Sequence, residues 1–227
     1  VTFDNVSLLG GYDKDFKERN PWKHPTQLRY DEESKNWPKE DRFISTGDNT
    51  TFDGFVIDQQ DQCAYQDEEK SGRREKPCDN PLKFWLPATI RNNVIINPGL
   101  DGIVACAGSV IENNIVVNAL EWAIVVNHHA THSKKLATIK NNTLLFSWSF
   151  GAPAQGKYDG SGIGLKAPAL VTQNIIANMD NNGIYMPMEA EKNSITKNVF
   201  WMNHWSNLKH DRGANSPVVD DQSMDTL

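Results

Sequence analysis

The chain has 227 residues, a mass of 25.5 kDa and a formal net charge of −6 at neutral pH. A chain of this length can bury a full hydrophobic core, which excludes a miniprotein held together by disulfides alone. Its basic residues are not clustered, so no nucleic-acid partner is predicted, and no stretch approaches the roughly 20 apolar residues of a membrane-spanning helix.

The sequence begins with Val1 and has no visible targeting segment, so we expect either that a leader was removed or that a longer chain extends beyond it. The chain has three cysteines, so one pair can form and one cysteine is left over. Cys63 and Cys78 bracket a polar, charged stretch and are either a loop-closing disulfide or two free thiols. Cys106 is expected to be a small buried or half-buried residue rather than a reactive thiol, and strand alternation places it on the outward face of its strand.

One pattern, apolar-x-polar-Asn-x-apolar, recurs five times between residues 90 and 202. The asparagines in its fourth position are Asn93, Asn114, Asn142, Asn174 and Asn198. An earlier copy at 51–58 carries Gly54 in that position. Because Asn and Gly both tolerate a positive φ, the pattern predicts a sharp turn between two short strands, with the amides hydrogen bonded along a stack.

A second pattern, a small residue followed by isoleucine, lies between these asparagines and places in register Ile103, Ile124, Ile163 and Ile184. The shortest unit has 10 residues from Asn93 to Ile103 and 11 from Ile103 to Asn114. Longer spacings elsewhere predict loops inserted at two fixed corners. Continuing the register in both directions adds Leu82 and Leu208 to the isoleucine column.

A unit of about 21 residues with several short β runs excludes α-solenoids, whose units are longer. It predicts an all-β fold, a coil of parallel strands in which each turn stacks on the last and long loops lie at the corners. Over residues 44–205 the sequence resembles the pectate-lyase-like superfamily of secreted proteins. This resemblance implies a single-stranded, right-handed parallel β-helix of about 7–8 coils. We expect one domain over 1–212, with atypical coils over 1–43 and regular coils over 44–205, followed by a polar tail over 213–227.

If the isoleucine column is buried, alternate residues after each isoleucine face solvent and stack from coil to coil. This predicts one polar patch from residues far apart in sequence, namely Asn127, His129, Lys166, Tyr185 and Glu189. Insertions at 61–80, 128–136 and 147–160 lie on either side of this strand, so we expect a groove.

The resemblance implies that this groove binds an acidic, uronate-containing polysaccharide and cleaves it by β-elimination. Such a reaction needs a base, a positive group that stabilises the enolate-like charge, and an acid for the leaving oxygen. We expect Lys166 to be the base or the charge stabiliser, with His129 as the alternative base and Tyr185 as the acid. Residues predicted to contact the polysaccharide are Trp85, Lys83, Asn127, Tyr158 and Asp159.

The resemblance also implies Ca²⁺ as a possible cofactor, for which Glu189 and Asn127 offer oxygen ligands. The His-rich segment with His128, His129 and His132 allows another metal site, although it contains no carboxylate at ligand spacing. Secretion to the periplasm or the extracellular space is expected, and the oligomeric state is not predicted.

Two other functions remain open at this stage. A glycoside hydrolase of the same fold would need paired carboxylates, brought in from the corners by Asp101, Glu121 and Asp159. A non-catalytic carbohydrate-binding, adhesin or structural β-helix would use the groove only as a surface. Three further tryptophans, Trp148, Trp201 and Trp205, are expected to pack beneath loops.

Overall fold

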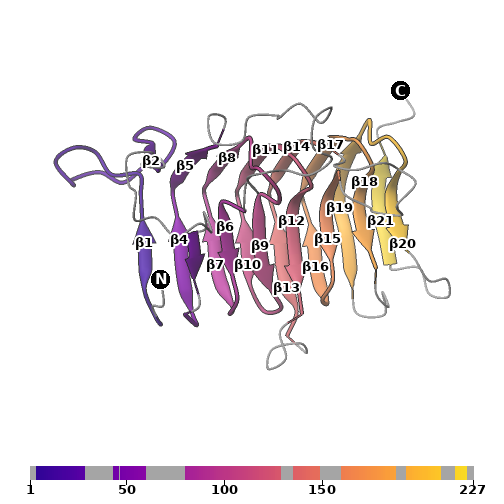
Figure 1. Ribbon diagram of the computed structural model, residues 1–227, viewed down its shortest axis with the longest axis horizontal. Coiled ribbons are helices and arrows are strands. Elements are labelled where there is room, and N and C mark those ends of the chain that lie inside the picture. The colour runs from indigo at the N-terminus through magenta and orange to yellow at the C-terminus, as the bar shows by residue number, and fades with distance from the viewer. Residues whose placement is uncertain are drawn as a thin grey trace, which may run out of the picture.

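The computed structural model describes residues 4–28, 43–45, 47–59, 80–128, 135–148, 160–187, 193–210 and 218–223. Within these ranges all ladders between strands are parallel, and the strands stack into an elongated coil with its ends at opposite sides (Figure 1). Three strands make one turn of the coil, so the strands form three columns.

The first column contains β1 (Ser7–Leu9), β4 (Thr50–Asp53), β7 (Ala88–Arg91), β10 (Val110–Glu112), β13 (Ala137–Lys140), β16 (Ala169–Thr172) and the start of β19 (Ser194–Trp201). The second column contains β2 (Thr26–Leu28), β5 (Phe55–Asp58), β8 (Val94–Ile96), β11 (Ile115–Ala119), β14 (Thr143–Ser147), β17 (Ile175–Met179) and the end of β19. The third column is a seven-stranded sheet of β3 (Phe43–Ser45), β6 (Leu82–Phe84), β9 (Ile103–Cys106), β12 (Trp122–Asn127), β15 (Ser161–Leu165), β18 (Asn182–Met186) and β20 (Ser206–His210).

The predicted parallel β-helix is therefore confirmed. Ile103, Ile124, Ile163 and Ile184 pair in register and are fully buried, so the isoleucine column is the axis of the core. The two extensions of this column are also correct, because Leu82 pairs with Ile103 and Leu208 with Ile184. Inside the segment read as a polar tail, Val218–Ser223 forms β21, which pairs in parallel with β19 and extends the stack.

The five asparagines of the repeat form a buried ladder at the turn between the first and second columns. Each amide donates from Nδ2 to Oδ1 of the next asparagine, at 3.0 Å from Asn93 to Asn114, 2.9 Å from Asn142 to Asn174 and 2.8 Å from Asn174 to Asn198. Each Oδ1 also accepts a backbone N–H from the coil before it, for example from Asn142 to Asn174 at 2.9 Å. Every amide is thus satisfied inside the core, as burial of a polar group requires.

The expected positive φ does not belong to the ladder asparagines but to the residue before each of them. Asn92, Asn113, Asn141, Gln173 and Lys197 have φ between 55° and 59°. The earlier copy is shifted in the same way, since Asp53 pairs with Arg91 and Gly54 therefore stands opposite Asn92. The sequence pattern assigned the positive φ to the ladder asparagine because asparagine tolerates that conformation, and in three of the five coils the residue before it is asparagine as well.

Phe55, not Gly54, occupies the ladder position of the second coil. Its backbone N–H donates to Asn93 Oδ1 at 3.0 Å, and its ring stacks on Phe52 with the centroids 4.5 Å apart. The amide ladder thus begins at Asn93, where the core beneath it becomes aromatic.

The small residue before each isoleucine is required by a close approach at the corner that enters the third column. A Cβ on Gly102 would lie 2.5 Å from Val116 Cγ1, and one on Gly162 would lie 2.6 Å from Ile176 Cγ2. Both contacts are with core side chains of the second column. The coils that carry glycine at this corner therefore have no room for a Cβ, because the chain turns there across the narrow width of the coil.

The outer face of the first column carries charges of alternating sign. Asp53, Arg91, Glu112 and Lys140 stand in register on successive coils. Arg91 Nε lies 2.7 Å from Asp53 Oδ2, and Lys140 Nζ lies 2.9 Å from Glu112 Oε2. Opposite charges at neighbouring rungs stabilise the stack and keep this face polar.

Candidate functional site

The predicted patch lies on the outer face of the third column, where the described residues form two rows. One row contains Lys83, Val104, Val125, Gly164 and Tyr185, which pair in register from β6 to β18. In the second row, Asn127 pairs with Cys106, and the Lys166 backbone N–H bonds to Val126 O, which places Lys166 beside Asn127. Lys166 and Asn127 are therefore neighbours, as the alternation predicted.

Lys166 is exposed at the surface and its ammonium lies above an indole ring. The Lys166 Nζ atom is 4.8 Å from the centroid of the Trp122 ring. An aromatic face attracts a cation, so this contact holds the amine in one place while leaving it accessible. Sequence reasoning missed Trp122, because strict alternation from Ile124 does not place it on this face.

Gly164 makes room for the Trp122 ring. A Cβ at this position would lie 1.5 Å from Trp122 Cζ3 and 1.6 Å from Cε3, so any side chain would displace the indole. Gly164, the second glycine of "GIGLKAP", could have indicated this arrangement from the sequence. Its position in the strand faces outward, where a side chain is otherwise expected.

Tyr185 is on the predicted face but is buried, with only 5% of its surface exposed. Its ring meets Trp122 edge to face, with the centroids 5.8 Å apart and the planes at 87°. With Val125, these two rings form a small apolar cluster outside the main core. The packing of Tyr185 supports Trp122 from below and does not favour a role as an exposed acid.

A second lysine–tryptophan pair lies at the other end of the same face. Lys83 Nζ is 4.4 Å from the centroid of the Trp85 ring, and Trp85 is 43% exposed. Lys83 and Lys166 are separated by the strands β9 and β12, so three rungs of about 4.8 Å each separate their strands. The face thus presents two ammonium groups, each held over an indole, along the helix axis.

Cys106, expected on this face, is buried there with 2% exposure. Burial raises the pKa of its thiol above the ordinary value, which outweighs a weak contact between Sγ and the Ser109 hydroxyl at 4.0 Å. A thiol with a raised pKa carries little thiolate, so Cys106 is unsuited to nucleophilic chemistry. Val104 is likewise buried although alternation predicts it to face solvent.

Several predicted residues lie outside the described part of the chain. These are His129, His132, Tyr158, Asp159, Glu189, Cys63 and Cys78. The roles given to them, including the base, the loop contacts and the disulfide, therefore stay predictions.

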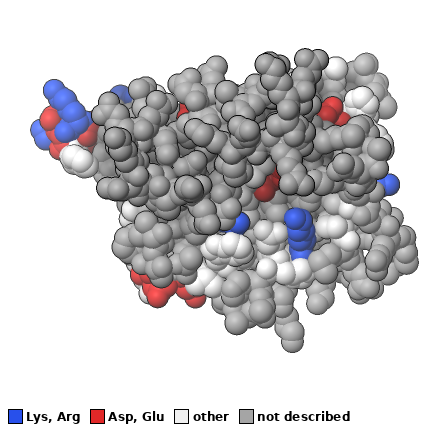
Figure 2. Space-filling model, in the orientation of Figure 1, with Lys and Arg blue, Asp and Glu red and all other residues white. Residues whose placement is uncertain are grey.

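The three tryptophans expected beneath loops are exposed instead, at 47% for Trp148, 39% for Trp201 and 65% for Trp205. They belong to the second column and its turn towards the third. On the side of the molecule seen in Figure 2, described Lys and Arg side chains stand apart among uncharged residues and mix with acidic ones at the N-terminal end. No large basic patch is visible among them.

Residues 32–216 match the profile of a family described as "Periplasmic copper-binding protein (NosD)". This match spans most of the 227 residues. The chain belongs to the NosD family. Membership in this family agrees with the parallel β-helix fold and confirms the predicted secreted or periplasmic localisation, whereas it replaces the expected pectate-lyase-like assignment.

Searches of curated proteins and of solved structures gave no match for this NosD-family chain. Among the described residues, no helix is long and apolar enough to cross a membrane.

Among the described residues of this NosD-family chain, no cluster of His, Cys, Asp or Glu side chains forms a copper centre. Copper is held by imidazole, thiolate or thioether donors gathered around one point. Across the described ranges, no three His, Cys, Asp or Glu residues come close enough to hold a metal ion. Cys106 is buried with a raised pKa, and His128 is exposed at the end of β12. The calcium prediction gains no support either, since of its two residues only Asn127 is described.

Proposed function

We propose that this NosD-family chain is a periplasmic binding protein for an acidic polysaccharide, which lies along the outer face of the third column. The observation that carries this proposal is the exposed Lys166 ammonium, held 4.8 Å above the Trp122 ring. A fixed cation beside a flat strand face suits the carboxylate of a uronate ring.

One feature of the face supports a polymer rather than a small ligand. The second pair, Lys83 over Trp85, repeats the arrangement of Lys166 over Trp122 three rungs away. The overall charge of −6 opposes a polyanion, so attraction must come from local cations and should weaken with salt.

β-Elimination is the reaction that this face could add to binding. A base removes the proton on the carbon α to the uronate carboxylate, the bond to the leaving glycosidic oxygen breaks, and that oxygen takes a proton. The products are an unsaturated uronate end and a new hydroxyl end. Lys166 would stabilise the charge on the carboxylate or act as the base, with His129 as the alternative base. The burial of Tyr185 does not favour it as the acid.

Binding is tested by affinity electrophoresis in gels that contain polygalacturonate or alginate. We expect retardation that Lys166→Ala weakens at least several-fold and that Lys166→Arg retains, because Arg keeps both the charge and the contact with the indole. Lys23→Ala is the matched control, since Lys23 is an exposed lysine in the connection between β1 and β2. Equal mobility in gels with and without polymer contradicts the proposal.

The reaction is tested separately by following ultraviolet absorbance of unsaturated ends, with and without Ca²⁺. An increase that Lys166→Ala abolishes supports the lyase. New reducing ends without absorbance point to the hydrolase, and binding without cleavage leaves the chain as a binding protein.

Copper binding is the second candidate, favoured by the description of the family that the chain matches. It is tested by equilibrium dialysis of the protein against copper, followed by metal analysis. Because the described residues gather no ligand set, stoichiometric copper that His128→Ala does not remove would place the ligands elsewhere in the chain. If no copper binds, this chain lacks the copper binding that the description of its family names.

A further inference from the structure

From β8 to β19 the outer face of the second column is largely apolar, unlike the outer face of the first. The preceding strand β5 ends this apolar surface with the exposed Asp58, which pairs with Ile96. The outward residues of the apolar surface form two rows that pair in register across five coils. We call this surface the apolar strip; it consists of Val94, Ile115, Thr143, Ile175 and Val199 in one row and Ile96, Val117, Leu145, Ala177 and Trp201 in the other.

Solvent reaches much of the apolar strip. Ile175 is 45% exposed and Trp201 is 39% exposed, and most of the other members are half-buried. The strip carries no charged side chain, whereas the corresponding face of the first column carries Asp53, Arg91, Glu112 and Lys140. A contiguous apolar surface kept open on one face of a periplasmic protein marks an interaction site.

Exposed large apolar side chains extend the strip past its second row, where the strands end. Phe146 is 42% exposed, Trp148 is 47% exposed and Met202 is 63% exposed. Phe146 and Met202 have positive φ values of 57° and 50°, and the chain turns sharply at these residues along the edge of the strip. The Trp148 indole N–H donates to Asn118 Oδ1, so this ring is held along the edge.

Amide groups line the same edge. Asn118 Nδ2 donates to Asn97 Oδ1 at 2.6 Å, and Asn97 Nδ2 donates to Asp58 Oδ1 at 3.0 Å. Asn97, Asn118 and Asn178 share the positive-φ turn position of successive coils with Phe146. An apolar platform thus has hydrogen-bonding groups beside it, repeated from coil to coil.

We infer that the apolar strip and its edge bind an uncharged, linear polysaccharide that runs parallel to the helix axis. The flat C–H faces of sugar rings pack on indole and aliphatic side chains, while their hydroxyls need amide partners at the rim. The strip supplies the apolar side chains and its edge supplies the amides. Because the strip carries no charge, it favours an uncharged polysaccharide.

The spacing of the coils favours a polymer over a globular protein as the occupant. Each coil adds about 4.8 Å along the axis, which is close to the length that one pyranose ring adds to an extended polysaccharide. Successive sugars can therefore meet equivalent side chains on successive coils. A protein partner without stacked strands of its own does not share this period. A second copy of this chain does share it, so self-association is measured separately below.

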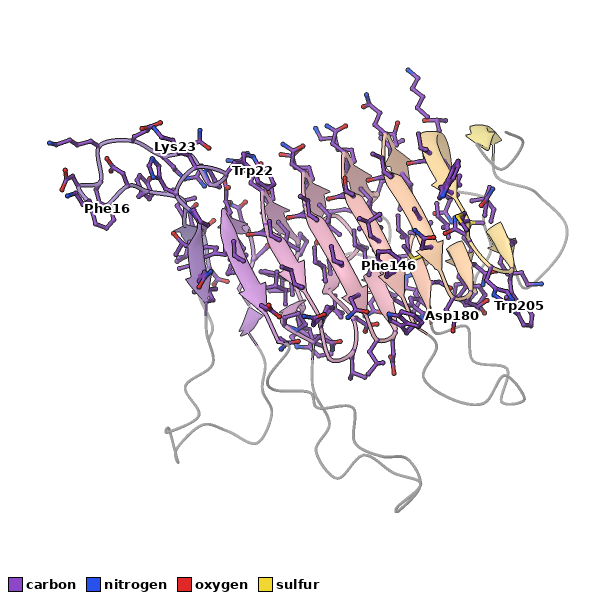
Figure 3. All side chains as sticks on the ribbon, turned by 90° about the horizontal axis from the view of Figure 1, so that it is seen from above. Phe16, Trp22, Lys23, Phe146, Asp180 and Trp205 are labelled. Atoms are coloured by element: carbon purple, nitrogen blue, oxygen red, sulfur yellow. The ribbon has the colours of Figure 1, made fainter. Side chains whose placement is uncertain are left out.

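This surface is separate from the face that carries Lys166, because the two belong to different columns. Figure 3 places Phe146 and Trp205 towards the C-terminal end of the coil. Phe16, Trp22 and Lys23 lie at the opposite end, in the connection between β1 and β2. Trp22 is 55% exposed and provides a matched control tryptophan that does not belong to the strip.

The test is co-sedimentation of the protein with microcrystalline cellulose and with chitin, under conditions in which the protein alone stays in solution. We expect at least one polymer to retain the wild-type chain. Trp201→Ala together with Trp148→Ala should reduce the bound fraction at least ten-fold, while Trp22→Ala should leave it unchanged. Trp148→Phe keeps an aromatic ring without the N–H and should bind better than Trp148→Ala.

Circular dichroism of the variants verifies that the coil is intact, and Lys166→Ala verifies that the two surfaces act independently. Lys166→Ala should leave binding to cellulose or chitin unchanged even if the acidic polymers fail to bind at all. No retention by either polymer overturns the inference, as does an equal loss in Trp22→Ala. Concentration-dependent self-association that the double tryptophan variant abolishes would also overturn it, because the occupant would then be a second copy.

Discussion

Asn114 Nδ2 donates to Asn142 Oδ1 at 3.1 Å, although the two residues are 28 positions apart in the sequence. The same amide donates to Ile90 O at 2.9 Å, and Asn114 Oδ1 accepts from the backbone N–H and Nδ2 of Asn93 at 3.1 Å and 3.0 Å. One side chain therefore joins three successive coils inside the core.

Replacing Asn114 by Ala should lower the free energy of unfolding by about 3–5 kcal/mol, because several hydrogen bonds are lost and buried partners are left unsatisfied. Asn114→Asp should be worse at neutral pH, since a second oxygen would face the acceptor oxygens of Ile90 and Asn142. Urea unfolding measures both. Asn113→Gly is the control, because Asn113 is exposed with φ of 59° and glycine tolerates that conformation. A loss in the control as large as in Asn114→Ala would show that the turn, not the ladder, stabilises this corner.

Asp53 should make the stability depend on pH in the acid range. Burial alone raises the pKa of its carboxyl, but hydrogen bonds from Asn92, Arg19 and Arg91 outweigh burial and hold the pKa below its ordinary value of 3.8. A group with a lowered folded-state pKa stabilises the fold above its unfolded pKa and loses that contribution as the pH falls through the lowered value.

Asp53→Asn should therefore cost about 2–3 kcal/mol at neutral pH, where the wild-type carboxylate is paired with two arginines. The difference from the wild type should shrink as the pH falls below 3.8. Thermal unfolding at a series of pH values measures this, with Asp15→Asn as a control on an exposed ion pair of 4.0 Å. A stability difference that stays constant across the acid range would contradict the assignment.

Gly164→Ala should displace the Trp122 ring and disorder Lys166 above it. Since the added Cβ would lie 1.5 Å from Trp122 Cζ3, we expect a loss of about 1–3 kcal/mol and weaker binding of acidic polymers. A double-mutant cycle with Trp122→Ala isolates the cause. Once the ring is removed, Gly164→Ala should have little further effect; additive losses would mean that the strand itself rejects the methyl group.

Cys106 should react slowly with thiol reagents in the native protein. Its burial raises the pKa of the thiol and blocks access. In a Cys63→Ser, Cys78→Ser background, labelling by a disulfide reagent should accelerate sharply in urea. Rapid labelling without denaturant would mean that the face over β9 opens in solution.

The sequence determined the coil, the isoleucine column and the corner at which the asparagines stack. Ile103, Ile124 and Asn114 could be placed because each coil buries the same side of the chain, so burial repeats in the sequence with the period of the coil. The neighbour relation of Asn127 and Lys166 followed from the same register.

Only the tertiary structure decided which outward side chains are accessible. Trp122 leaves the strand alternation and covers Gly164, which buries Tyr185 and fixes Lys166. Trp201 is exposed, although we expected it to pack beneath a loop. Register fixes the height of a residue in the stack, whereas exposure depends on the size of side chains on the coils above and below, and local periodicity does not encode that contact.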